Sequence, residues 1–98
     1  SYSGPHVKTI YAFLSKRPVV ATEDAVKDMP YLTQGKHVLL FDIDKPETLL
    51  RALIRLHNNK KLAETLALNA YLYAKKFSWR KISALHLKLY KKLLTHAS

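Results

Sequence analysis

The sequence predicts an α/β fold in which helices outnumber the strands of a small parallel sheet. Two short apolar runs, residues 19–21 and 38–41, suit strands that are buried on both faces. The segments around them repeat apolar residues every three or four positions, as amphipathic helices do. With 98 residues, 48% of them hydrophobic, the chain is long enough for one small domain, residues 1–98, with its own core.

The first predicted helix lies between two proline-containing breaks. Pro5 suits the first turn of a helix, where its missing N–H costs nothing. Pro18 ends the helix, because the residue before a proline disfavours the α conformation. The apolar face between the two prolines consists of Val7, Ile10, Tyr11 and Leu14. The first strand, residues 19–21, follows directly.

A short helix is predicted over residues 24–28, with Thr22 and two acids at its start and Pro30 after its end. Glu23 and Asp24 could also be a carboxylate pair for acid–base chemistry. We prefer the capping interpretation, because no other reactive group of the sequence converges on these two acids.

The second strand is predicted over residues 37–41. Asp42 and Asp44 follow it, and we interpret them as a strand-end turn rather than as magnesium ligands. The next helix begins at Pro46, with Asp44 or Lys45 near its cap, and ends at residues 58–59.

Two helices are predicted for the remainder of the chain, over residues 61–76 and 79–95, with Ser78 as the N-cap of the second. The last helix carries two apolar stripes, which predict that it is buried on more than one side or meets another domain. The stripes are Ile82, Leu85, Leu89 and Leu93, and Leu87, Tyr90 and Leu94.

The charge is strongly positive and unevenly distributed. The net charge is +10, all seven acids lie at or before Glu64, and residues 75–98 carry seven basic residues. Such a segment is either a solvated basic face or a surface for anionic lipid or nucleic acid. Cysteine is absent, and the histidines lack metal-ligand spacing, so we expect no metal site. No apolar run reaches the roughly 20 residues that span a bilayer.

The loop before the first helix is a candidate anion site, because the first N–H groups of a helix are unpaired and its dipole is positive there. Gly4 would allow close approach of a ligand, and Lys8 adds a cation. His6 lies in the same loop, where it could contact a phosphate or remain in solvent. The signal alone is weak, since most helix N-termini bind only water.

Five segments in order resemble the nucleotide-sugar-binding half of group 1 glycosyltransferases of the GT-B type, similar to family 4. No single segment is specific, but the ordered set, from about Ser3 to Leu94, is. The segments are residues 4–12 (G-x-x-V-K-T-I-x-A), 17–22 (R-P-V-V-A-T), 35–41 (G-K-H-V-L-L-F), 44–49 (D-K-P-E-T-L) and 77–79 (F-S-W).

The resemblance implies that residues 1–98 are the C-terminal portion of a nucleotide-sugar-binding domain. The two strands would be the last two βα units of a six-stranded, doubly wound, Rossmann-like parallel sheet, which is incomplete on its own. Because two parallel strands leave both outer edges unpaired, either the chain is a fragment of a longer enzyme or copies pair as a homodimer through their strand edges. The last helix would cross back towards the N-terminal domain.

The resemblance also implies a site. The donor diphosphate would lie at the loop before the first helix, and the residues that bind the donor would be Ser3, Gly4, His6, Val7, Lys8 and Tyr11. Ser3 and Tyr11 occupy positions where the family often has glutamates that contact the sugar and the ribose. Lys16 replaces a family glycine. No catalytic side chain, metal or cofactor is implied.

The implied partners are a nucleotide-diphospho-sugar donor and an acceptor held by the N-terminal domain, with sugar transfer under retention. The expected location is cytoplasmic, at the inner membrane face. Two alternatives remain open. One is a basic module that binds an anionic membrane, or less readily nucleic acid, through residues 75–92. The other is a degenerate, inactive transferase domain, which is suggested by Tyr11.

Overall fold

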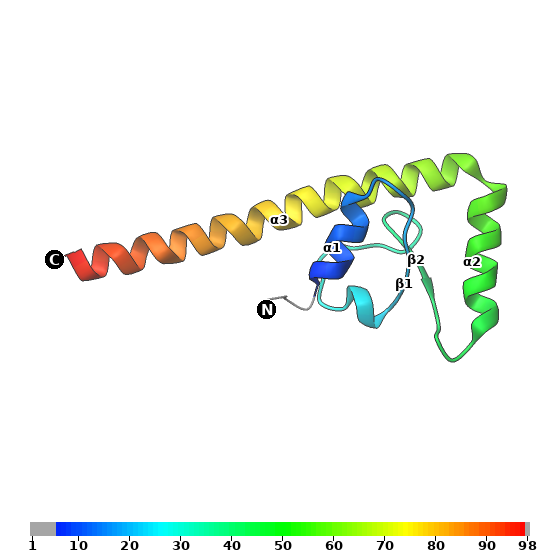
Figure 1. Ribbon diagram of the computed structural model, residues 1–98, viewed down its shortest axis with the longest axis horizontal. Helices are drawn as coiled ribbons and strands as arrows, with labels where there is room; N and C mark the ends of the chain where they lie inside the picture. Colours follow the sequence, from blue (N-terminus) through cyan, green and yellow to red (C-terminus); the bar gives the residue numbers. More distant parts are fainter. Residues whose placement is uncertain (1–5, 98) are drawn as a thin grey trace.

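The computed structural model describes residues 6–97 (Figure 1). The elements follow in the order α1 (Val7–Leu14), β1 (Val20–Thr22), the 3₁₀ helix η1 (Asp24–Val26), β2 (Leu39–Phe41), α2 (Pro46–Asn58) and α3 (Lys60–Ala97). The predicted α/β class is confirmed in this form: the described chain is rich in helix and contains a small parallel sheet. The short helix after β1 is a 3₁₀ turn and ends two residues earlier than predicted.

The two strands pair in parallel, with Val20 opposite Leu39 and Thr22 opposite Phe41. Both strands therefore end at the same edge of the sheet, here called the carboxyl edge and defined by Thr22, Phe41 and the turns that follow them. α1 and α2 also begin at this edge, the lower one in Figure 1. The topology thus places two helix N-termini beside two strand ends.

The outer edge of β2 is covered by the loop that precedes it. The N–H of Gly35 donates to the Val38 carbonyl at 2.8 Å, and the Gln34 side-chain oxygen accepts the N–H of Leu40 at 2.8 Å. In the described part of the chain, β1 pairs with β2 alone. A further strand could therefore join the sheet on the β1 side only.

The core lies between α1, the sheet and the first half of α3. Phe13 of α1 is fully buried among residues that include Val38 of the loop before β2 and two alanines of α3, Ala70 and Ala74. The small alanine side chains let α1 lie close to α3. A second, smaller cluster joins β2 to α2 and α3 through Leu39, Ala52 and Leu66.

α3 is one continuous helix of 38 residues, so the predicted break at Ser78 is wrong. Asn59 caps the start of α3 by accepting the N–H of Leu62 at 2.9 Å. From residue 60 to 97 the sequence has no glycine or proline, and a serine inside a helix costs only a fraction of a kcal/mol. The Phe77 ring also stacks on Tyr73, one turn earlier in the same helix, with centroids 5.9 Å apart.

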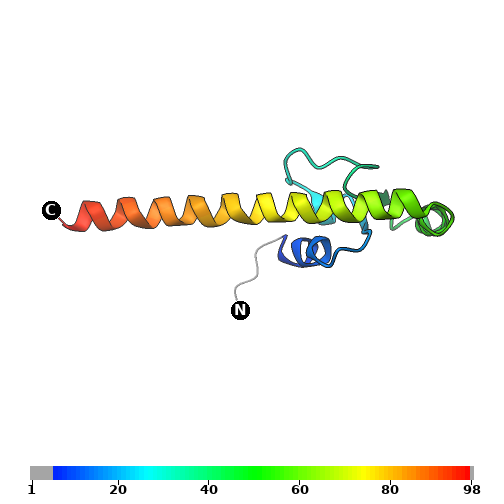
Figure 2. The same ribbon diagram turned by 90° about the horizontal axis from the view of Figure 1, so that it is seen from above.

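The second half of α3 extends well beyond the rest of the molecule (Figure 2), so the structure as a whole is elongated and measures 62 × 28 × 23 Å. The two apolar stripes predicted to be buried are exposed here, with Leu93 69% accessible. The expected burial is therefore not found among the described residues: His6 contacts Phe77 at the start of this half, but the side chains of both stripes remain exposed.

Candidate functional site

The start of α1 carries the predicted donor-binding residues that the structure describes. His6 occupies the N-cap position without a side-chain cap, and its carbonyl accepts the N–H of Ile10 at 2.9 Å. Its Nδ1 is buried and has no hydrogen-bond partner among the described residues, while its ring meets Phe77 edge-on at 6.3 Å. Val7 and Lys8 form the first turn, and Lys8 is exposed. This turn offers unpaired N–H groups and one cation.

Of the other three predicted donor-binding residues, the structure describes only Tyr11. Tyr11 lies one turn further along α1 and is 71% exposed, so its phenol faces outward beside the first turn. Ser3 and Gly4 lie outside the described residues. The structure thus brings His6, Val7 and Lys8 together at the first turn of α1, and Tyr11 lies beside this turn.

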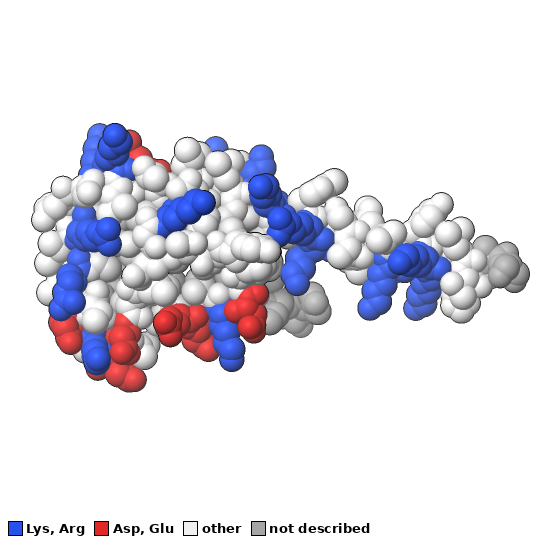
Figure 3. Space-filling view, turned by 180° about the vertical axis from the view of Figure 1, so that it is seen from behind, with Lys and Arg blue, Asp and Glu red and all other residues white. Residues whose placement is uncertain are grey.

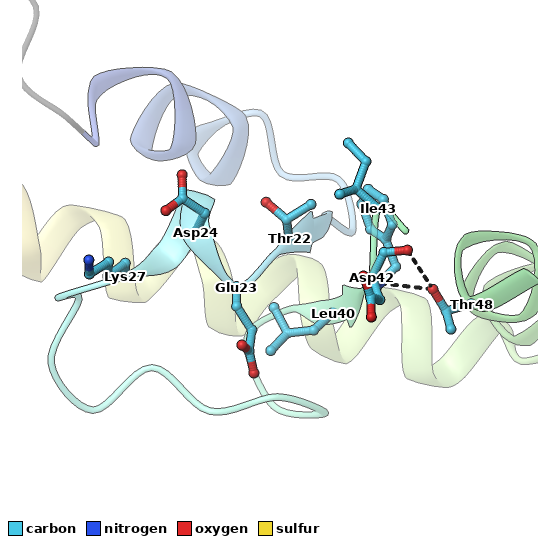
Figure 4. A pocket seen from close by; sticks show the side chains of 9 residues that line it. Thr22, Glu23, Asp24, Lys27, Leu40, Asp42, Ile43 and Thr48 are labelled. Atoms are coloured by element: carbon cyan, nitrogen blue, oxygen red, sulfur yellow. Dashed lines mark hydrogen bonds between the residues drawn. The ribbon is translucent and has the colours of Figure 1, made fainter. Parts of the chain in front are cut away.

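A hollow of about 670 Å³ opens at the carboxyl edge, where the turns after β1 and β2 face each other (Figure 4). Open α/β sheets bind their ligands at the carboxyl ends of their strands, so the predicted parallel topology was sufficient to locate this hollow. We did not single it out from the sequence. Its lining residues are Thr22, Glu23, Asp24, Lys27, Leu40, Phe41, Asp42, Ile43 and Thr48.

Local hydrogen bonds fix the turn after β2. Thr48 Oγ1 accepts the N–H of Asp42 at 2.8 Å and lies 2.7 Å from the Lys45 carbonyl, to which it donates. Asp42 Oδ1 accepts the N–H of Asp44 at 2.9 Å. The two aspartates therefore form the strand-end turn that the sequence predicts. No group of three or more candidate metal ligands occurs within residues 6–97.

A second set of bonds ties η1 to its surroundings. Thr22 Oγ1 accepts the N–H of Ala25 at 3.4 Å, whereas Glu23 occupies the N-cap position of η1 without a side-chain cap bond. Thr9 Oγ1 of α1 donates to the Ala25 carbonyl at 2.8 Å. The first turn of α1 and the hollow therefore belong to one connected edge of the molecule.

The carboxyl edge is acidic. Glu23, Asp24 and Asp42 line the hollow with Lys27 as the one cation of its lining, and the following turn adds Asp44. Figure 3 shows acidic side chains gathered along this edge, which is the lower one in that view. Carboxylates repel a diphosphate, so at this edge the favourable position for an anion is the first turn of α1 with Lys8.

A different hollow, of about 620 Å³, lies between the loop over residues 30–37 and α3. His37 Nδ1 accepts the N–H of Thr33 at 3.0 Å, and burial together with the Lys36 charge lowers the pKa of His37. The Tyr73 hydroxyl donates to the Pro30 carbonyl at 2.8 Å, and burial raises the pKa of Tyr73. The Tyr73 bond thus holds the loop onto α3, and the His37 bond fixes the loop itself, with the His37 ring 5.2 Å from the Tyr73 ring. Reading the sequence did not indicate this hollow.

Searches for similar proteins found no matching family model, no curated protein and no solved structure. None of the helices in the described range has the length and apolar character needed to cross a membrane.

Proposed function

We propose that this chain is the C-terminal portion of the nucleotide-sugar-binding domain of a GT-B glycosyltransferase. The enzyme would transfer a sugar, with retention, from a nucleotide-diphospho-sugar to an acceptor bound by an N-terminal domain. The observation that supports this most is the arrangement of the carboxyl edge. Two parallel strands end there beside the N-termini of α1 and α2, as in the last two βα units of a doubly wound sheet.

The backbone at Lys16 adds independent support. Lys16 has a φ of 62°, the left-handed conformation that glycine adopts without steric cost. It stands directly before Arg17-Pro18, where the resembling family carries a glycine. A left-handed conformation at this position is one that a glycine would adopt without strain, which supports the proposed resemblance.

We expect Lys16→Gly to be more stable than Lys16→Ala by about 1 kcal/mol, because only glycine removes the strain of the positive φ. Both variants lose the contact of Lys16 Nζ with the Tyr71 ring, now 4.7 Å from its centroid, so their difference isolates the backbone. Urea denaturation followed by circular dichroism measures it. Equal stability, or a more stable alanine variant, would contradict the left-handed backbone conformation at residue 16.

The two edges of the sheet are consistent with β2 being the outermost strand of a larger sheet. Gln34 and Gly35 occupy the outer edge of β2, whereas β1 has no second strand partner within the described residues. Further strands of the same domain would add beside β1. A homodimer paired through β1 is the alternative use of this edge.

In the proposed enzyme, the donor diphosphate lies at the first turn of α1, near Lys8 and the N–H groups of Val7 and Lys8. Their role is to stabilise the negative charge that develops on the leaving diphosphate, so the chain need not supply a nucleophile. Tyr11 can donate one hydrogen bond to a ribose hydroxyl, whereas a carboxylate can accept two. In this proposal the acceptor site belongs to the N-terminal domain, so residues 1–98 alone should not turn over.

A degenerate transferase domain is the second candidate, because of the acids around the hollow. Glu23, Asp24 and Asp42 repel an anionic donor, and Tyr11 cannot replace the two acceptor bonds of a glutamate. Such a domain would keep the fold and its contacts with other domains but would not bind a nucleotide.

Titration with UDP, GDP and a nucleotide sugar, followed by amide NMR shifts, separates the two candidates. A donor site predicts shifts concentrated in residues 6–11, which Lys8→Glu abolishes. The matched control is Lys60→Glu, the same charge change at the start of α3, and it should leave the shifts intact. Absence of shifts at millimolar nucleotide would reject the donor site and favour the degenerate domain.

A further inference from the structure

The second half of α3, residues 77–97 and here called the free half, carries positive charge without any acid. Lys81, Lys88 and Lys92 follow one another at spacings of seven and four residues, and Arg80 and Lys91 lie beside them. Residues at these spacings share one side of a helix. The free half therefore has a basic side with five cations.

Most of the remaining circumference of the free half is apolar and exposed, with Ser83, His86 and His96 among the polar residues that interrupt it. Ile82, Leu89 and Leu93 repeat the same seven- and four-residue spacing, displaced by one position from the lysines. The exposed fractions are high from residue 79 to residue 96, with Trp79 at 69%. The exposed apolar residues are Trp79, Ile82, Leu85, Leu87, Leu89, Tyr90, Leu93 and Leu94.

None of these apolar side chains belongs to the two core clusters, whose last α3 member is Ala74. Figures 1 and 2 both show the free half projecting away from the sheet and from α1. An exposed apolar face of this length on a projecting helix is typical of a binding surface.

We propose that the free half binds an anionic lipid surface, lying in the plane of the interface with its apolar side towards the acyl chains. Basic residues on one side and Trp and Leu on the other are the pattern of interfacial helices. The long lysine side chains can reach the headgroup phosphates while their methylene stems remain in apolar surroundings. A lipid surface thus accounts for both sides of the helix.

A second copy of the chain and nucleic acid would each account for one side only. A second copy of the free half would cover apolar side chains but would bring five more cations and no acid to pair with them. Nucleic acid would match the charge but would leave the leucines and Trp79 in water. The acids of the chain do not oppose the proposed orientation, because they lie on the body and none projects from the free half (Figure 3).

The first measurement is binding of the whole chain to phosphatidylcholine vesicles with and without phosphatidylglycerol. Trp79 is the only tryptophan, so its fluorescence reports directly on the apolar side of the free half. We expect a blue shift and co-sedimentation with the anionic vesicles only, weakened as salt is raised. Equal behaviour with both vesicle types, or no binding, would overturn the proposal.

Two pairs of variants test the two sides of the helix. Lys88→Glu with Lys91→Glu should weaken vesicle binding by at least about 25-fold, since each cation contributes about fivefold. Leu89→Ser with Leu93→Ser should abolish the blue shift. The matched controls make the same changes elsewhere, Lys60→Glu with Lys61→Glu and Leu50→Ser with Leu53→Ser, and should change binding less than threefold.

Each competing occupant gives a distinct result. Concentration-dependent dimers that Leu89→Ser with Leu93→Ser dissociates, without vesicle binding, would assign the face to a second copy. Tight binding of an oligonucleotide that the leucine variants leave unchanged, again without vesicle binding, would assign the free half to nucleic acid. The vesicle experiment contains no nucleotide, so failure of the donor titration leaves its outcome unaffected.

Discussion

Replacing Phe13 by alanine is expected to cost about 3–5 kcal/mol of unfolding free energy, the largest effect of any substitution considered for this chain. The Phe13 ring is completely buried and meets Tyr73 edge-on, with centroids 6.2 Å apart. It packs against Ala70 and Ala74, whose small side chains cannot move in to fill the space. The variant therefore leaves a cavity at the contact between α1 and α3.

Urea denaturation followed by circular dichroism measures this loss, with Tyr11→Ala as the control. Tyr11 is an aromatic residue of the same helix but is 71% exposed, so its truncation should change stability by no more than about 0.5 kcal/mol. Phe13→Leu gives a second point and keeps the protein folded if the alanine variant unfolds, because it leaves a smaller cavity. Similar losses for Phe13→Ala and Tyr11→Ala would contradict the described core.

The elements that the sequence predicts well are those determined by local signals. The apolar runs predict the strands and the prolines at positions 5, 18 and 46 predict helix boundaries, because these signals act on the residues next to them. The structure places β1, β2, α1 and α2 close to the predicted positions. The parallel pairing follows as well, because both runs are too apolar for a strand with one face in water. The positive φ of Lys16 carries no such signal, since lysine gives no indication of it.

The candidate site was predicted only in part, because its electrostatics depend on the topology. Glu23 and Asp24 lie far along the chain from Asp42, and each pair of acids alone has an ordinary local interpretation as a cap or a turn. They share one hollow because two parallel strands end at the same edge. The predicted parallel topology already implies that these acids meet at one edge.

The break predicted at Ser78 came from reading a favourable N-cap residue as a helix boundary. Serine is a strong N-cap, yet it is tolerated inside a helix when nothing nearby stops the chain. Phe77 stacks on Tyr73 next to Ser78 and stabilises the helix there. The free half therefore continues the direction of the first half of α3. The direction of the free half is what exposes both of its sides.

A proline at position 79 distinguishes one continuous helix from two. If Ser78 were an N-cap, residue 79 would be the first helical position, where proline is tolerated. Inside a continuous helix, Trp79→Pro removes the backbone hydrogen bond of residue 79 and its ring clashes with the preceding turn, at a cost of about 3 kcal/mol.

We expect Trp79→Pro to unwind or kink the free half while the core between α1 and the first half of α3 stays folded. Circular dichroism at 222 nm should show lost helicity, and the amide NMR shifts of residues 80–97 should move towards coil values because a detached helix of this length is marginal in water. Trp79→Ala is the control and should keep full helicity. Unchanged helicity in Trp79→Pro would instead indicate a helix boundary at Ser78, and the free half could then turn back onto the body and bury its leucines there.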